Sequence, residues 1–205
     1  MQPRSVKWED KVRFTDLEVW KAFKGGSESA FIYIYEGYYD ALVNYGFKFS
    51  KDKDLIQDCI QDMFVELRDR RKNLSDTDKI KPYLFKILRL KILKILQKNT
   101  KYTNIDEGFK SFDFVISYEE HLINRQLSEY QMARLQKAVS NLTTKEREAI
   151  FHFYYELHSY EQIAQIMGYS DAKVARNLVY KAVNSLRQAL EADSSSFFML
   201  TFTFL

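Results

Sequence analysis

Apolar side chains recur every three or four residues along most of this chain, and that spacing limits its possible folds more than any other feature. Such a period places the apolar groups on one face of an α-helix. The sequence has only 6 Gly and 2 Pro in 205 residues, which leaves little material for the turns of an all-β fold. Hydrophobic residues make up 46% and charged residues 29%, which is typical of a folded chain rather than a disordered one. The sequence therefore predicts an all-α protein.

Local signals divide the N-terminal half into separate helices. The Gly25-Gly26 pair should end a first short helix, and Ser27 can cap the helix that follows. Polar residues 70–79 predict a loop. Cys59, the only cysteine, falls among apolar positions and is expected to be a small core residue, and a single cysteine excludes an intramolecular disulfide. The expected helices run over Leu17 to Phe23, Phe31 to Phe49, Leu55 to Leu67 and Ile80 to Gln97.

The last third of the chain carries two capping boxes, in which two residues three apart satisfy each other's backbone N–H groups at a helix start. They are Thr143-x-x-Glu146 and Ser159-x-x-Gln162. Two helices joined by a glycine-containing turn form a helix-turn-helix. The pattern predicts helices over Thr144 to Glu156, Tyr160 to Met167 and, after the tight turn Gly168-Tyr169-Ser170, Asp171 to about Leu190.

The long last helix has two chemically distinct faces. One face is apolar and carries Val174, Ala175, Leu178, Val179, Ala182 and Leu186. The opposite arc carries cationic and amide donors, which suit the phosphates and base edges of a DNA major groove. The helix-turn-helix pattern around this arc favours DNA binding over an ordinary solvated surface. The candidate DNA-binding residues are Ser170, Lys173, Arg176, Asn177, Tyr180 and Lys181.

Charge is distributed unevenly, although the net charge is only +3. Residues 66–101 carry twelve Lys and Arg against four Asp and Glu, whereas residues 102–130 carry six acidic residues against two basic ones. The weak apolar pattern of 102–130 predicts a flexible acidic linker with one helical turn near its end. The third helix shows an acidic stripe, which suits either solvent or a basic partner helix. Its members are Asp54, Asp58, Gln61, Asp62 and Asp69.

Two strings in the first half carry a resemblance to a known family. The segment from Leu55 to Leu74, which contains Asp58-x-x-Gln61-Asp62-x-Phe64, and the segment from Pro82 to Arg89 resemble region 2 of the extracytoplasmic-function (ECF) sigma factors. Residues 142–190 resemble their region 4. The resemblance implies two small helical domains joined by a flexible linker. The implied boundaries are 1–101 for region 2, 102–130 for the linker and 131–191 for region 4. The resemblance does not explain residues 192–205, which we separate as an apolar tail.

The resemblance also implies an alternative sigma factor. Region 2 would bind the clamp helices of RNA polymerase and open the −10 element, and region 4 would bind the −35 element and the polymerase flap. The positions that match the polymerase-binding residues are Asp58, Gln61 and Asp62, and Phe64 matches a core position. The positions that match the −10 element are Asn73, Lys79, Tyr83, Lys86 and Arg89.

Two residues depart from the family pattern. The family usually has Trp where Tyr83 stands, and Tyr83 still supplies a stacking ring. It usually has Asn where Leu90 stands, and Leu90 cannot hydrogen-bond a base. The implied partners are core RNA polymerase, promoter DNA and an anti-sigma factor. No cofactor and no enzymatic activity are expected.

Two other classes of function remain as alternatives. A helix-turn-helix regulator without a sigma role would bind a palindromic site as a dimer. An enzyme is the remoter alternative, because the sequence shows no metal-ligand spacing, phosphate-binding loop or nucleophile motif. The only histidines are His121, His152 and His158, and the last two are expected to point to different helix faces.

The two ends of the chain bear on location. Residues 1–5 lack the apolar stretch of a signal peptide, and no run of roughly 20 apolar residues exists, so a cytoplasmic location without membrane insertion is expected.

Residues 197–205 include seven apolar residues and no charge. We expect either a disordered end or a segment covered by a groove between the domains or by another copy of the chain.

Overall fold

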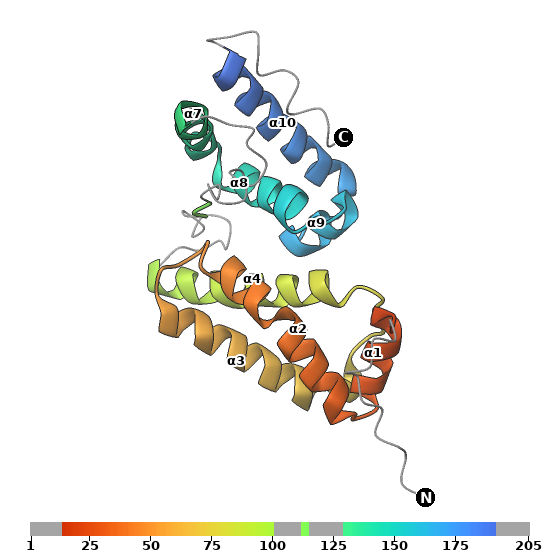
Figure 1. Cartoon of the computed structure of the whole chain (residues 1–205). Helices are drawn as coiled ribbons and strands as arrows, with labels where there is room; N and C mark the ends of the chain where they lie inside the picture. Colours follow the sequence, from red (N-terminus) through yellow and green to blue (C-terminus); the bar gives the residue numbers. More distant parts are fainter. Residues whose placement is uncertain (1–13, 101–111, 115–128, 192–205) are drawn as a thin grey trace, which may run out of the picture. The chain divides into compact units, whose positions relative to one another are not determined.

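The structure is a computed structural model that describes residues 14–100, 112–114 and 129–191 (Figure 1). These residues form helices and no strand, so the all-α prediction is confirmed. The chain divides into two compact units, of which residues 1–109 make up most of the first and residues 110–164 and 169–205 the second. In the described part, no helix has both the length and the apolar character to cross a membrane. The tail at 197–205 and most of the expected linker lie outside the described residues.

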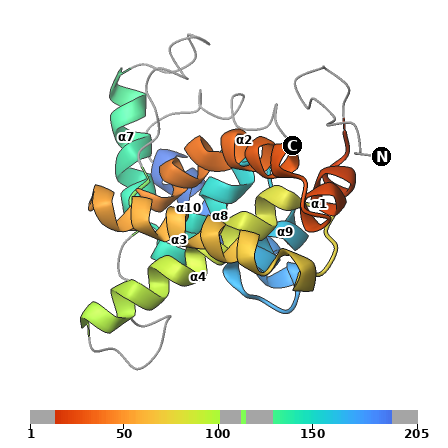
Figure 2. The same cartoon turned by 90° about the horizontal axis from the view of Figure 1, so that it is seen from below.

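The N-terminal unit is built from α1 (Asp16–Lys24), α2 (Glu28–Gly46), α3 (Lys53–Asp69) and α4 (Ile80–Thr100), with a short 3₁₀ turn, η1 (Arg71–Asn73), after α3. Each of α2, α3 and α4 packs against the other two, and α1 packs against α2 (Figure 2). Side-chain caps start the helices: Ser27 Oγ accepts from the Ala30 N–H as expected, and Asp52 caps α3. Thr15 and Glu18 form a further capping box at the start of α1.

Large apolar side chains fill the interior of this unit. Tyr45 of α2 stacks on Phe85 of α4 with ring centroids 4.8 Å apart, and both rings are fully buried. Gly46 allows α2 to approach α3 closely, because a Cβ at this position would lie 2.5 Å from Ile56 Cγ2. Cys59 is buried as expected, and this burial raises the pKa of its thiol.

The loop that leads from η1 into α4 is fastened to α1. The indole N–H of Trp20 donates to the backbone carbonyl of Ser75 at 2.9 Å. Lys24 forms an ion pair with Asp76, and this hydrogen bond lowers the pKa of the Asp76 carboxyl. The backbone N–H of Ile80 donates to Asp16 Oδ2 at 2.8 Å. We call these three contacts the α1 anchors; they connect residues more than 50 positions apart in the sequence.

The helices of the C-terminal half, which we describe together as the C-terminal unit, are α7 (Glu129–Ser140), α8 (Thr144–Ile150), a π-helical turn η2 (Phe151–Tyr155), α9 (Tyr160–Met167) and α10 (Ala172–Glu191). Both predicted capping boxes are present, at Thr143–Glu146 and at Ser159–Gln162. In Figure 1, α10 lies along α7 and α8, and it packs against both. Helix α7 was not predicted beyond a single turn. The α8 segment changes to π-helical geometry at Phe151, where a continuous helix to Glu156 was expected.

Part of the expected linker packs onto this unit. The rings of Phe112 and Phe114 are buried against Phe151, with centroids 5.6 and 5.7 Å away. Arg147 Nε donates to the Phe112 carbonyl at 2.9 Å, and Gln136 Nε2 donates to the Phe114 carbonyl at 3.3 Å. Residues 112–114 therefore belong structurally to the C-terminal unit.

His152 and His158 are buried together, so the prediction that they point to different faces is wrong. Nδ1 of His158 lies 3.2 Å from Nδ1 of His152, and Glu148 Oε1 lies 3.9 Å from His152 Nε2. The chain doubles back here because η2 changes the helical period and Leu157 adopts a left-handed φ of 53°. Within the described ranges, no cluster of His, Cys, Asp and Glu has the arrangement of a metal site.

Candidate nucleic-acid interface

The helix-turn-helix consists of α9, a turn at Gly168 and α10. Gly168 adopts a φ of 79°, which few residues other than glycine take readily, and the Tyr169 N–H donates to the Ala164 carbonyl at 2.8 Å. The side of α10 that packs inward is centred on Ala175, Val179 and Ala182, all of which are buried. Val174, which was expected on this side, is 40% exposed. The small residues at the contact allow α10 to pack closely.

All six candidate DNA-binding residues of this motif are exposed. Tyr180 is 67% exposed, although its ring is large and apolar. The Lys173 N–H donates to Asp171 Oδ1 at 2.7 Å, so a side chain caps the start of α10. The exposed set is Ser170, Lys173, Arg176, Asn177, Tyr180 and Lys181. Cationic, hydroxyl and amide groups thus lie together on the outer arc of one regular helix, which is the arrangement that major-groove readout requires.

The acidic stripe of α3 is also exposed, as predicted. The opposite side of α3 is buried along its length, which fixes the direction of the outward carboxylates. Val65 lies within the stripe and is 52% exposed, so the surface offers an apolar contact among its charges. At one edge, Lys91 of α4 binds Glu66 Oε1 at 2.6 Å, and this hydrogen bond lowers the pKa of Glu66. The exposed members are Asp54, Asp58, Gln61, Asp62 and Asp69.

The five candidate −10 residues differ in accessibility. Asn73 and Lys79 are exposed on the loop, and Lys86 is half-buried on α4. The ring of Tyr83 packs edge-on against Trp20 with centroids 5.1 Å apart, and partial burial raises the pKa of its hydroxyl. Arg89 is only 4% exposed, so its placement does not support a direct contact with DNA. Asn73 and Lys79 are therefore accessible, Tyr83 and Lys86 are partly accessible, and Arg89 is not.

Sequence reasoning missed the residues that hold the loop between η1 and α4 in place. Trp20 was expected only as part of the short helix from Leu17 to Phe23, and Lys24 and Asp16 were not singled out. Their hydrogen-bond partners, Ser75, Asp76 and Ile80, come after α2 and α3 in the sequence. The available local signal was an indole N–H on a buried aromatic residue, since such a group usually finds a hydrogen-bond acceptor when buried.

Comparisons with known protein families match both halves of the chain. Residues 34–102 match the family model described as Sigma-70 region 2, and residues 132–179 match the model described as Sigma-70, region 4. The ECF RNA polymerase sigma factor SigM of Bacillus subtilis (strain 168) is 24% identical over 160 residues, which cover 78% of this chain and 91% of SigM.

Solved structures show the same fold. CnrH in complex with the cytosolic domain of CnrY gives a TM-score of 0.57 at 20% identity, with 87% of this chain and 99% of that chain covered. The sigma factor RpoE in complex with the anti-sigma factor NepR from Bartonella quintana gives a TM-score of 0.55 at 22% identity, with 80% and 98% covered. The two family models match successive parts of the chain, and SigM matches most of it, so the chain belongs to the sigma-70 family as a sigma factor of the ECF type.

Proposed function

We propose that this protein is an alternative sigma factor that binds core RNA polymerase and directs it to promoters through a −35 and a −10 element. The observation that carries the proposal is the presence, in one chain, of an exposed acidic face on a region 2 helix and an exposed polar arc on a region 4 recognition helix. The first suits a basic partner helix, and the second suits duplex DNA. Polymerase supplies the chemistry, and this subunit supplies positioning.

Reconstitution tests the proposal directly. The purified chain is mixed with bacterial core RNA polymerase, and the complex is isolated by size exclusion and used to transcribe a library of promoter fragments. We expect co-elution and transcripts from a subset of fragments that share two spaced elements. A chain that instead binds a palindromic duplex as a dimer, without polymerase, would support the alternative of an ordinary helix-turn-helix regulator.

An anti-sigma factor is a further proposed partner. One of the similar solved structures is a sigma factor bound to an anti-sigma factor, and the likeness extends over 80% of this chain. We expect such a partner to compete with core RNA polymerase for this protein.

The recognition helix gives a prediction that separates base reading from phosphate contact. Arg176→Ala should weaken promoter binding by about 1–3 kcal/mol and relax the preference at one −35 position, if Arg176 reads a base edge. Lys181→Ala should weaken binding to all sequences alike. It should also reduce the slope of log K against log salt concentration by about one. Gln188→Ala changes an exposed residue later on the same helix and serves as control. Holoenzyme binding to promoter variants at several salt concentrations measures both effects. Identical, sequence-independent losses for Arg176 and Lys181 would contradict base reading.

Tyr83 gives a prediction about promoter opening. Tyr83→Ala should slow open-complex formation far more on duplex promoters than on pre-melted ones, because a ring that stacks on an unpaired base contributes about 1–3 kcal/mol. Tyr83→Phe keeps the ring and its contact with Trp20 and should behave like the unmodified protein. Fluorescence-detected opening on both templates measures the difference. Equal loss on both, together with a lower melting temperature, would assign Tyr83 to the core alone.

A further inference from the structure

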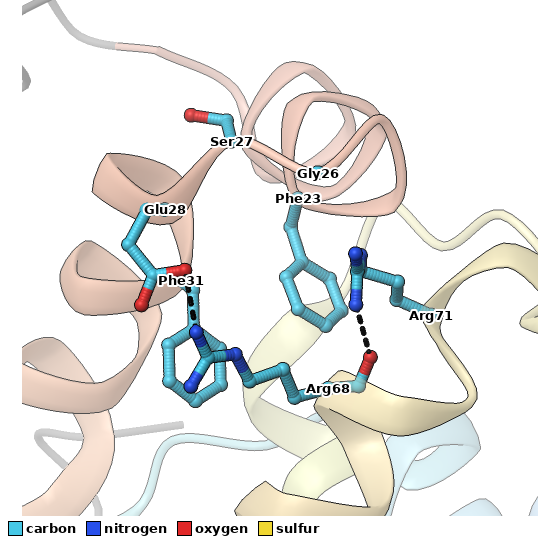
Figure 3. Close-up of a pocket in the computed structure, with 7 residues that line it drawn as sticks. All are labelled: Phe23, Gly26, Ser27, Glu28, Phe31, Arg68 and Arg71. Atoms are coloured by element: carbon cyan, nitrogen blue, oxygen red, sulfur yellow. Dashed lines mark hydrogen bonds and ion pairs between the residues drawn. The ribbon is translucent and has the colours of Figure 1, made fainter.

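A pocket lies where the turn between α1 and α2 meets the end of α3 and η1 (Figure 3). It contains two guanidinium groups and one carboxylate, so its charge is positive. It also adjoins the N-terminus of α2, where the helix dipole favours negative charge. None of its charged residues was singled out by the sequence. The lining residues are Phe23, Gly26, Ser27, Glu28, Phe31, Arg68 and Arg71.

Arg71 is held with part of its donor set unused. Its Nη1 donates to the carbonyl of Arg68 at 2.8 Å, which fixes the guanidinium against the end of α3. Its Nε is buried and has no hydrogen-bond partner among the described residues. A buried donor without an acceptor is costly, and native structures rarely keep one without a reason. An acceptor that enters the pocket would satisfy Nε.

Gly26 leaves the approach to this group open. It has a φ of 93°, and even a Cβ at this position would come within 3.9 Å of Arg71 Nε and 4.0 Å of Nη2. A larger side chain would therefore occupy the space beside the guanidinium. Figure 3 shows Arg71 beside Gly26 and Phe23, without a side chain from the glycine over it.

Arg68 forms the second wall. Its guanidinium lies over the Phe31 ring at 5.5 Å and binds Glu28 Oε2 at 3.1 Å. The pair is about half exposed, with 53% of the Arg68 side chain and 58% of the Glu28 side chain accessible, so solvent weakens it and an anion can compete with Glu28. The ring contact keeps the guanidinium oriented during such an exchange.

We propose that this pocket binds a phosphate group, and that in transcription the phosphate is a backbone phosphodiester of the promoter strand opened at the −10 element. The assignment to DNA rests on the proposed sigma function. Arg71 begins the segment that continues through Asn73 to Lys79, and the α1 anchors hold that segment at a fixed distance from the pocket. Guanidinium groups match phosphate geometry with paired donors, and phosphate contacts set the register of a protein on its nucleic acid.

The test uses the full chain and two probes, inorganic phosphate and a fluorescent single-stranded oligothymidylate. Phosphate should shift the Arg71 Nε–H signal in ¹H–¹⁵N spectra. Arg71→Gln should weaken oligonucleotide binding about tenfold and lower its salt slope by about 0.7, which is one phosphate contact on a single strand. Glu28→Gln should strengthen oligonucleotide binding by about threefold, because it removes the competing carboxylate. Arg70→Gln is the matched control, since it removes the same charge from an exposed neighbour that does not line the pocket.

Two outcomes would overturn the proposal. Equal effects of Arg71→Gln and Arg70→Gln on both probes would show that general charge, not the pocket, attracts the anion. A shift with phosphate but no specific loss of oligonucleotide binding would assign the pocket to a free anion and remove the DNA role. Thermal unfolding of each variant shows whether the variant still folds. A gain in affinity for Glu28→Gln would also argue against a folding defect, because a destabilised protein would bind less tightly. Co-elution with core polymerase is measured in parallel: its failure in the unmodified chain would contradict the sigma function while the phosphate titration still decides the pocket.

Discussion

Reversing Asp58 and Asp62 to lysine is expected to abolish co-elution with core RNA polymerase while leaving the fold intact. Both side chains are exposed, one turn apart on α3, and the opposite side of that helix is buried. The change turns two negative charges into two positive ones, so a basic partner helix would be repelled at close range. Surface substitutions of this kind usually change stability by within about 0.5 kcal/mol. Size exclusion with core enzyme measures the binding, and circular dichroism measures the helical content.

A matched variant makes this result specific. Glu36 and Asp40 are also exposed and one turn apart, but on α2. Glu36→Lys with Asp40→Lys makes the same change of net charge and should leave co-elution unchanged if the α3 stripe is the docking surface. Loss of binding in both double variants would indicate general electrostatics. Retention in both would exclude the stripe as the site that binds polymerase.

Replacing Trp20 with alanine should destabilise the N-terminal unit by about 3–5 kcal/mol, because large-to-small changes in a packed core lose both burial and contacts. Trp20 is fully buried between Phe23 and Tyr83, with ring centroids 5.4 and 5.1 Å away. This loss is a large part of the roughly 5–15 kcal/mol that stabilises a typical domain. Urea unfolding followed by circular dichroism measures it.

Trp20→Phe separates packing from the hydrogen bond to Ser75. Phenylalanine keeps an aromatic ring but lacks the indole N–H, and Ser75 is exposed, so water can take the place of the lost donor. We expect a much smaller loss of stability, of about 1 kcal/mol for the hydrogen bond, and faster proteolysis of the loop around Ser75. An unchanged urea midpoint for Trp20→Ala would show that the ring does not stabilise this unit.

The sequence was informative wherever a local rule decided the structure. Capping side chains next to periodic apolar runs predicted the starts of α8 and α9, because a cap satisfies backbone N–H groups within a few residues. The glycine at position 168 predicted the turn before α10, and the apolar period of α10 predicted which arc of that helix faces outward. The exposed stripe of α3 was predictable because one face of that helix is fully apolar.

The remaining features depend on contacts between distant residues. Helix α7 was missed although Met132, Leu135 and Val139 have helical spacing, because it directly follows the acidic segment that was interpreted as a linker. Arg89 was expected to contact the −10 element because its position matches the family pattern, but at this position on α4 the side chain is 4% exposed. The pairing of His152 with His158 depends on the π-helical turn and on the left-handed backbone of Leu157, neither of which has a clear sequence signal. Val174 and Ala175 are adjacent, and only packing decides which one faces inward.

The α1 anchors order the loop between η1 and α4, which we propose contacts the −10 element, before any DNA binds. A free loop would have to lose backbone conformational entropy of about 1–2 kcal/mol per residue as it closed on a strand, and an already ordered loop loses far less. Yet the segment that matches region 2 begins at residue 34, whereas all three anchors come from residues 16–24. A protein trimmed to the matched segment would keep every residue expected to contact the −10 element and lose the preorganisation of the loop. Its promoter affinity should fall although none of those contact residues has changed, which makes α1 a determinant of binding that family boundaries leave out.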